Sequence, residues 1–263
     1  MQEYNKTDKK VHGLSQVIAK FNRTFVPEKP DDSHTNLYFD ALSRLLYGRW
    51  VQDGEQQYCL VLNVGTFEFQ LINEKRRSVF EIYINDRTIQ EVEEKIAELL
   101  SEVGFDTDGF LDPMHYEIPD YDYFTSPLKP WKEKDIRDWE TIRSLANTAC
   151  FYMKGYVMAE GEIRIWPHHF DTGVYVEANS EIGLGFGLAM KDPMVNEAYF
   201  YYSGYGLNGS TLEYDNLPEL TDGRWEVSEN WRGAVLPITE LESEAESKVR
   251  TFIEEVSITL LKK

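Results

Sequence analysis

The chain contains little cysteine, and its two cysteines lie far apart in the sequence. Cys59 and Cys150 are too few for the disulfide framework of a small secreted domain. Cys59 lies in a strand-like apolar run and Cys150 in a helix-like one. Each is therefore interpreted as a small buried hydrophobic residue, with a single bridge between them left open as an alternative.

Long apolar runs and basic charge are also scarce. No apolar run approaches the roughly 18 residues that a membrane helix needs, and the first thirty residues are too polar for a signal peptide. The 27 Lys and Arg residues against 46 Asp and Glu residues leave a net charge of −19, which would repel a phosphate backbone. The sequence therefore predicts a cytoplasmic protein that binds neither membranes nor nucleic acid.

Aromatic residues are abundant, at 14% of the chain, with 42% hydrophobic residues overall. A disordered chain would lack such residues, so we expect a folded globule with a substantial core. The pattern of elements predicts an α+β fold with two similar lobes. Each lobe is expected to contain an antiparallel sheet of three to four strands flanked by helices.

The amino-terminal lobe is expected over residues 35–104, after a polar leader over 1–34 that holds at most a short helix at 13–22. Apolar residues at helical spacing between 37 and 45 predict a helix capped by Ser33 or Thr35. Alternating residues then predict a three-stranded meander and a further helix, which Gly104 ends: strands at 58–62, 67–71 and 80–84, helix at 88–103.

Residues 105–132 are rich in Asp, Tyr and Pro and are interpreted as an acidic, solvated loop between the lobes. The carboxyl-terminal lobe is expected over residues 133–263. Its pattern begins and ends with a helix, and the strand-like segments between lie near 160–167, 172–178, 181–190 and 197–205.

The segment from Trp166 to Asp171, with the sequence Trp-Pro-His-His-Phe-Asp, is the main candidate site. If the backbone stays extended, His169 and Asp171 share one side and Trp166, His168 and Phe170 the other. Three interpretations compete. The segment lines a small-molecule pocket; it is a structural turn; or His168, His169 and Asp171 supply metal ligands, which no zinc-binding spacing supports.

Further candidates follow this segment in the chain. Glycine alternates with large apolar residues over 182–188, which predicts a strand with one bare face. That face is expected either to form a groove or to be covered by Tyr or Trp side chains. Glu197 and Tyr199 lie on the next strand, and Trp225 and Trp231 in a loop-rich stretch are expected to form a lid, a binding surface or an anchor for the loop.

The run over 163–171 resembles the signature of a family of uncharacterised bacterial proteins. In that family, W-P-H-H-F-D is followed by a Gly-rich strand and then by an acidic residue before a Tyr/Phe-rich strand, as in 182–185 and 197–201 here. The segments 223–225 and 231–237 are also similar, so the likeness covers roughly residues 136–262. A weaker likeness to a related family rests on Gly48-Arg49, Gly104 and residues 117–120, and that relative lacks the paired histidines. The resemblance implies a shape and no reaction.

Three functions remain as hypotheses. The first is a small-molecule-binding protein whose site uses the candidates named above: Trp166, His168, His169, Asp171, Glu197, Tyr199, Trp225 and Trp231. The second is a hydrolase-like enzyme with His169 as general base, Asp171 as its orienting group and Glu197 as a second acid or a ligand. The third is an interaction module, including a homodimer, without a small ligand. The sequence identifies no cofactor.

Overall fold

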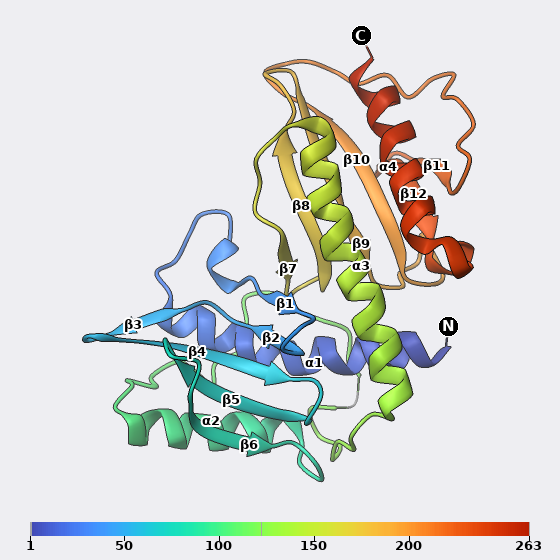
Figure 1. Cartoon of the computed structure of the whole chain (residues 1–263). Helices are drawn as coiled ribbons and strands as arrows, with labels where there is room; N and C mark the ends of the chain where they lie inside the picture. Colours follow the sequence, from blue (N-terminus) through green and yellow to red (C-terminus); the bar gives the residue numbers. More distant parts are fainter. Residues whose placement is uncertain (1, 122, 263) are drawn as a thin grey trace. The chain divides into compact units, whose positions relative to one another are not determined.

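A computed structural model describes residues 2–121 and 123–262 of the protein. The chain divides into two compact units (Figure 1). The N-terminal unit comprises residues 2–141 and 165–170, and the C-terminal unit comprises residues 142–164 and 171–263. These units differ from the expected lobes. The chain passes between the units at three places, after residues 141, 164 and 170, and none of these lies within the connecting segment 105–132.

The fold is α+β, as predicted, with four α-helices and two six-stranded antiparallel sheets in the described part of the chain. The sheets are larger than the three to four strands expected. In the N-terminal unit the strand order is β1-β2-β4-β5-β6, and β3 also pairs with β4. The bounds are β1 Tyr38–Asp40, β2 Leu45–Tyr47, β3 Val51–Asp53, β4 Gln56–Asn63, β5 Glu68–Asn73 and β6 Ser78–Tyr83.

Two helices pack against this sheet, α1 (Gln2–Phe25) against β4 and α2 (Ile89–Val103) against β6, and they contact each other. The predicted meander and the predicted helix at 88–103 are confirmed as β4, β5, β6 and α2. Thr88 caps α2 through a capping box, and Gly104 ends it with a φ of 108°.

Residues 2–34 differ from the polar leader that the sequence indicated, although the short helix expected at 13–22 lies within α1; residue 1 lies outside the described residues. Helix α1 spans 24 residues, and every residue over 11–22 is buried, including apolar residues such as Leu14 and Ile18. Polar residues at intervals of four are buried with them: Asp8, His12, Gln16 and Lys20. The pattern looked solvated because these side chains find their partners far away in the sequence.

The prediction of a helix between residues 37 and 45 is wrong. The segment forms β1 and β2, joined by a tight turn in which Arg44 has a φ of 58°. Leu42, which the helical spacing placed on the buried side, is 97% exposed. A short 3-10 helix, η1 (Ser33–Thr35), precedes these strands.

The sheet of the C-terminal unit has the order β11-β12-β10-β9-β8-β7. The predicted strands are confirmed as β7 to β10, whereas β11 and β12 occupy the stretch around Trp225 and Trp231 that was expected to be loop-rich. The bounds are β7 Arg164–Trp166, β8 Asp171–Glu177, β9 Ile182–Ala189, β10 Tyr199–Gly206, β11 Arg224–Val227 and β12 Arg232–Pro237.

Two helices cover one face of this sheet (Figure 1). They are α4 (Ala245–Leu261) and residues 142–157 of α3 (Glu133–Val157). Two 3-10 turns, η2 (Ile238–Glu240) and η3 (Glu242–Glu244), precede α4. Helix α4 contacts β10 and β12, and from α3 Arg143 donates to Thr172 Oγ1 at 2.9 Å. No helix in the described ranges combines the length and the apolar character that a membrane span requires.

Candidate functional site

The residues after Trp166 form a turn and not the extended chain on which the predicted alternation depended. The Phe170 amide donates to the Trp166 carbonyl at 2.6 Å, and Phe170 has a φ of 56°. The turn brings the rings of His168 and His169 side by side, with centroids 4.2 Å apart. The expectation that these two imidazoles lie on opposite sides is therefore wrong.

Phe170 anchors the turn in the core of the N-terminal unit. Its side chain is fully buried and stacks on the His12 ring at 5.1 Å and on the Trp139 ring at 6.4 Å. Trp139 in turn donates its indole hydrogen to Asp8 at 2.8 Å. The aromatic part of the motif is thus structural at this position, in line with one of the interpretations considered from the sequence.

The Pro167 carbonyl holds the turn against helix α1. It accepts hydrogen bonds from His12 Nε2 and from Gln16 Nε2, both at 2.8 Å. Because a carbonyl only accepts, Nε2 of His12 carries a hydrogen, and Nδ1 lies at hydrogen-bond distance from the Tyr121 hydroxyl, 3.0 Å away. Burial, with the charge of Asp8 as a smaller contribution, raises the pKa of Tyr121 to about 12.

A cluster of rings lies next to this anchor, and we call it the histidine–aromatic cluster: His115, Tyr116, Trp166, His168 and His169. His168 lies 5.6 Å from Tyr116 and 6.0 Å from Trp166 between ring centroids, and His115 lies 5.0 Å from Tyr116. His169 is exposed, the His115 side chain is 58% exposed, and the other three are half-buried. The cluster therefore presents several rings to solvent.

Polar contacts fix the position of the cluster. The Tyr116 hydroxyl donates to Gln16 Oε1 at 2.9 Å, so one glutamine of α1 links Tyr116 to the Pro167 carbonyl. Burial raises the pKa of Tyr116 well above the ordinary value for a phenol. His115 Nε2 lies 3.3 Å from Asp32 Oδ2.

The segment 105–132 supplies part of this cluster, although the sequence indicated only a solvated connection. Arg23 of α1 donates to main-chain carbonyls of the segment, those of Gly109 and Phe110 among them, and Phe110 is fully buried. His115, Tyr116 and Tyr121 were therefore missed as site residues. The signal that could have found them is the aromatic content of an otherwise acidic stretch, which a merely solvated loop does not need.

The predicted carboxylates belong to the other unit and are engaged there. Asp171, the first residue of β8, accepts from the Tyr201 hydroxyl at 2.7 Å. Glu197 accepts from the Thr239 amide at 2.9 Å and from its hydroxyl at 2.8 Å. His168 and His169 lie in the N-terminal unit and these carboxylates in the C-terminal unit.

The bare face of β9 is covered by tyrosines, which was one of the two alternatives expected for it, and does not form a groove. A methyl group placed on Gly183 would meet the Tyr175 hydroxyl at 2.3 Å, and one on Gly187 would meet the Tyr201 hydroxyl at 2.8 Å. Gly185 lies under the Tyr205 ring. The glycines at 183 and 187 are needed because side chains and backbone of the neighbouring strands approach them too closely for a methyl group.

The remaining aromatic candidates have partners within the C-terminal unit. Tyr199 donates to Asp192 at 2.6 Å and packs in a small apolar cluster together with Trp231. The Trp225 indole donates to the Pro218 carbonyl at 2.8 Å. Both tryptophans hold loops against the sheet, which was one of the roles expected for them.

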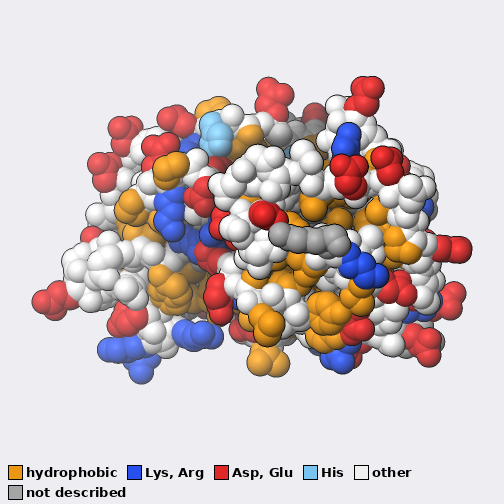
Figure 2. All heavy atoms as spheres, turned by 90° about the horizontal axis from the view of Figure 1, so that it is seen from above, with side chains coloured by type: hydrophobic (Ala, Val, Ile, Leu, Met, Phe, Trp, Pro, Cys, Tyr) orange, Lys and Arg blue, Asp and Glu red, His pale blue; other side chains and the backbone are white. Residues whose placement is uncertain are grey.

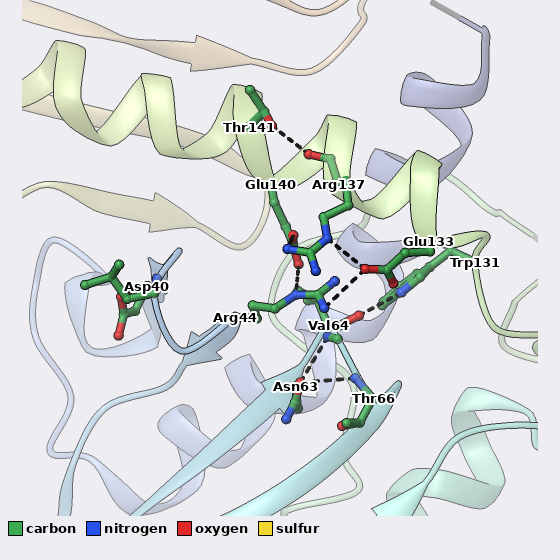
Figure 3. Close-up of polar contacts among 12 residues, drawn as sticks. Asp40, Arg44, Asn63, Val64, Thr66, Trp131, Glu133, Arg137, Glu140 and Thr141 are labelled. Carbon is green, nitrogen blue, oxygen red and sulfur yellow. Dashed lines mark hydrogen bonds and ion pairs between the residues drawn. The ribbon is translucent and has the colours of Figure 1, made fainter.

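A second polar cluster of the N-terminal unit surrounds the strained Arg44 (Figure 3). Its guanidinium bonds to Glu140 Oε1 at 2.6 Å and lies 3.4 Å from Glu133 Oε1, both on the first turns of α3. Its carbonyl accepts from the Val64 amide, and Val64 in turn accepts from the Trp131 indole at 2.7 Å. The left-handed conformation of Arg44 thus serves to join the β1–β2 turn to α3.

Metal ligation finds no support from geometry in the described residues, where no group of three or more His, Cys, Asp or Glu side chains could hold an ion. Both cysteines are free and buried. In comparisons with known proteins, no family model, no curated protein and no solved structure matches the chain. The resemblance of the motif to a bacterial family therefore stays a prediction.

Proposed function

We propose that the protein binds a small organic molecule with an aromatic ring at the histidine–aromatic cluster. The observation that carries the proposal is a partly exposed group of three imidazoles, a phenol and an indole. The centroid of each ring lies 4.2 to 6.0 Å from that of a neighbouring ring. Planar rings at these separations offer stacking and edge contacts to another planar ring, and the imidazole nitrogens add directional hydrogen bonds.

The supporting contacts favour a site that is formed before a ligand arrives. Tyr116, Gln16 and the Pro167 carbonyl form a continuous hydrogen-bonded chain, and Phe170 is locked in the core beneath the turn. A ligand would therefore meet side chains that are already ordered, which lowers the entropic cost of binding.

The chain's few histidines provide the test. Only five are present, so each imidazole is expected to give a separately assignable signal in a heteronuclear NMR spectrum. The protein would be titrated with a library of aromatic fragments that includes indole and benzoate. We expect binders to shift the signals of His115, His168 and His169, with smaller effects on the buried His12.

Two variants should remove binding, and one should not. Trp166→Ala and His169→Ala are expected to weaken fragment affinity by about tenfold each, since each deletes one ring contact. Tyr83→Ala is the matched control, because Tyr83 is a 62% exposed ring of the same unit that is not part of the cluster. Fragments that bind while leaving these three histidine signals unmoved, or a library with no binder, would contradict the proposal.

A further inference from the structure

A carboxylate lies beside the histidine–aromatic cluster. Asp32 Oδ2 is 3.3 Å from His115 Nε2, and the Asp32 side chain is 27% exposed. The charge of Asp32 also acts on a second ring of the cluster, because it adds to burial, the larger cause, in raising the pKa of Tyr116. The cluster therefore combines partly exposed rings with a half-buried negative charge.

No permanent cation neutralises this carboxylate. Among the residues that the structure describes, no lysine or arginine forms an ion pair with Asp32, and its basic neighbours are His115 and His34. Histidine, unlike lysine, is largely uncharged at neutral pH in its ordinary state. A half-buried carboxylate without a cation is costly, so a positive charge brought by a ligand would be stabilising at this point.

One oxygen of Asp32 is available as an acceptor. Oδ2 accepts from the Thr35 hydroxyl at 3.3 Å and faces His115, whereas Oδ1 faces His34 Nδ1 at 3.6 Å. That nitrogen accepts from the Lys29 amide at 3.4 Å, so in a neutral ring it carries no hydrogen for Asp32. Within the described ranges no other group donates to Oδ1, which can therefore accept from a bound molecule.

The other charges of the protein do not replace the missing cation. Arg23 also acts on Tyr116, but its guanidinium donates to four main-chain carbonyls between residues 109 and 113. The net charge of −19 attracts cations and repels anions, and Figure 2 shows acidic side chains spread widely over one face of the molecule. Electrostatics therefore favour a positively charged ligand over a neutral or anionic one.

We propose that the ligand of this cluster is an aromatic amine, whose ring contacts the rings of the cluster while its ammonium group binds Asp32. The inference rests on the proposed function, since it names the class of ligand for the same site. An ammonium group has three hydrogens to donate, and Oδ1 of Asp32 accepts one of them. Aromatic rings attract cations through their π faces, so the cluster itself adds to the preference.

Three indole derivatives of similar size test the preference for positive charge. Tryptamine ends in an ammonium group, 3-ethylindole in a methyl group and indole-3-propionate in a carboxylate. Each would be titrated into the full chain by isothermal calorimetry. Tryptamine is expected to bind about tenfold more tightly than 3-ethylindole, because its hydrogen bond to Asp32 is charge-assisted. Indole-3-propionate should bind about threefold or more weakly than 3-ethylindole, because its charge is repelled.

Asp32→Asn and Asp86→Asn form a matched pair of variants. Both aspartates lie in the N-terminal unit at left-handed positions, with φ of 57° and 63°, which asparagine also adopts. Asp86, however, is paired with Lys129. Asp32→Asn should weaken tryptamine binding about tenfold and change the affinity for 3-ethylindole by less than about twofold. Asp86→Asn should change both affinities by less than about twofold.

The outcomes separate this inference from the proposed function. The assignment of an ammonium ligand is overturned if 3-ethylindole binds as tightly as tryptamine, or if the two variants weaken tryptamine binding equally. The ring-binding site would survive either result. If none of the three compounds binds, the ring-binding site itself is contradicted and this inference falls with it. Far-UV circular dichroism would confirm that each variant is folded, and the comparison of the three compounds on the wild type needs no variant.

Discussion

Replacing one member of the buried ion pair between α1 and α2 tests how much the buried polar residues of α1 contribute to the free energy of unfolding. Lys20 Nζ lies 2.7 Å from Glu93 Oε2, and the two side chains are only 11% and 8% exposed. Lys20→Met leaves a carboxylate in the core without its cation. The expected loss in free energy of unfolding at neutral pH is about 3–5 kcal/mol.

The double variant Lys20→Met/Glu93→Leu should behave differently. With both charged groups replaced, no charge has to be desolvated on folding. The free energy of unfolding is therefore expected to return to the wild-type value or exceed it by about 1–4 kcal/mol. Thermal unfolding would show the contrast clearly, since about 1 kcal/mol shifts Tm by roughly 2–4 °C in a chain of this size. The single variant should then unfold about 6–20 °C below the wild type.

The pH dependence gives an independent check. Burial raises the pKa of Glu93 above its ordinary value of 4.5, although Lys20 opposes the shift. A carboxyl group whose folded pKa is raised contributes stability that is fully present below pH 4.5 and is lost as the pH rises through the folded pKa. Without Lys20 the folded pKa should rise further, so the deficit of Lys20→Met should shrink as the pH is lowered towards 4.5.

The matched control is Lys95→Met, which breaks a surface pair with Glu98 whose side chains are 41% and 57% exposed. It should change stability by no more than about 0.5 kcal/mol. The reasoning is refuted if Lys20→Met costs as little as this control, or if the double variant loses as much as the single one.

Three further predictions concern local chemistry. Thr88→Ala should reduce the free energy of unfolding by about 1 kcal/mol in urea titrations, because it removes the acceptor for the Glu91 amide at 3.1 Å. In alkaline titration at 295 nm, one phenol should ionise near pH 12, and its absorbance change should be absent in Tyr121→Phe. The stability it contributes should be full below pH 10 and lost as the pH rises through 12. Cys59 and Cys150 should react with a thiol reagent only on unfolding, since both are buried and burial raises the pKa of Cys59 to about 12.

The sequence predicted well those elements whose pattern is local. The alternation in β4, β5 and β6 and the apolar spacing of α2 with Gly104 at its end are each readable within one segment. Helix α1 was predicted only as a short helix at 13–22, and its length and burial were missed because its buried polar residues look like a solvated surface. Nothing near Gln16 in the sequence shows that its partners are Tyr116 and the Pro167 carbonyl.

The geometry of the candidate site could be predicted only in part, because it too depends on contacts between residues far apart in the sequence. The motif around Trp166 stands out by composition, whereas its backbone geometry depends on Phe170 taking a left-handed conformation to reach the His12 ring. Alternation rules assume an extended chain, so they placed the two histidines on opposite sides. His115 and Tyr116 come from a segment whose acidic residues hid its aromatic ones.

The division of the N-terminal unit into 2–141 and 165–170 has a consequence for synthesis on the ribosome. His12 and Gln16, which donate hydrogen bonds to the Pro167 carbonyl, precede it in the sequence by 155 and 151 positions. Their acceptor is therefore synthesised about 150 residues after they are. Phe170 also arrives only then. A nascent chain that stops after residue 141 therefore lacks the six residues that complete its first unit, and neither unit can be excised as one uninterrupted fragment.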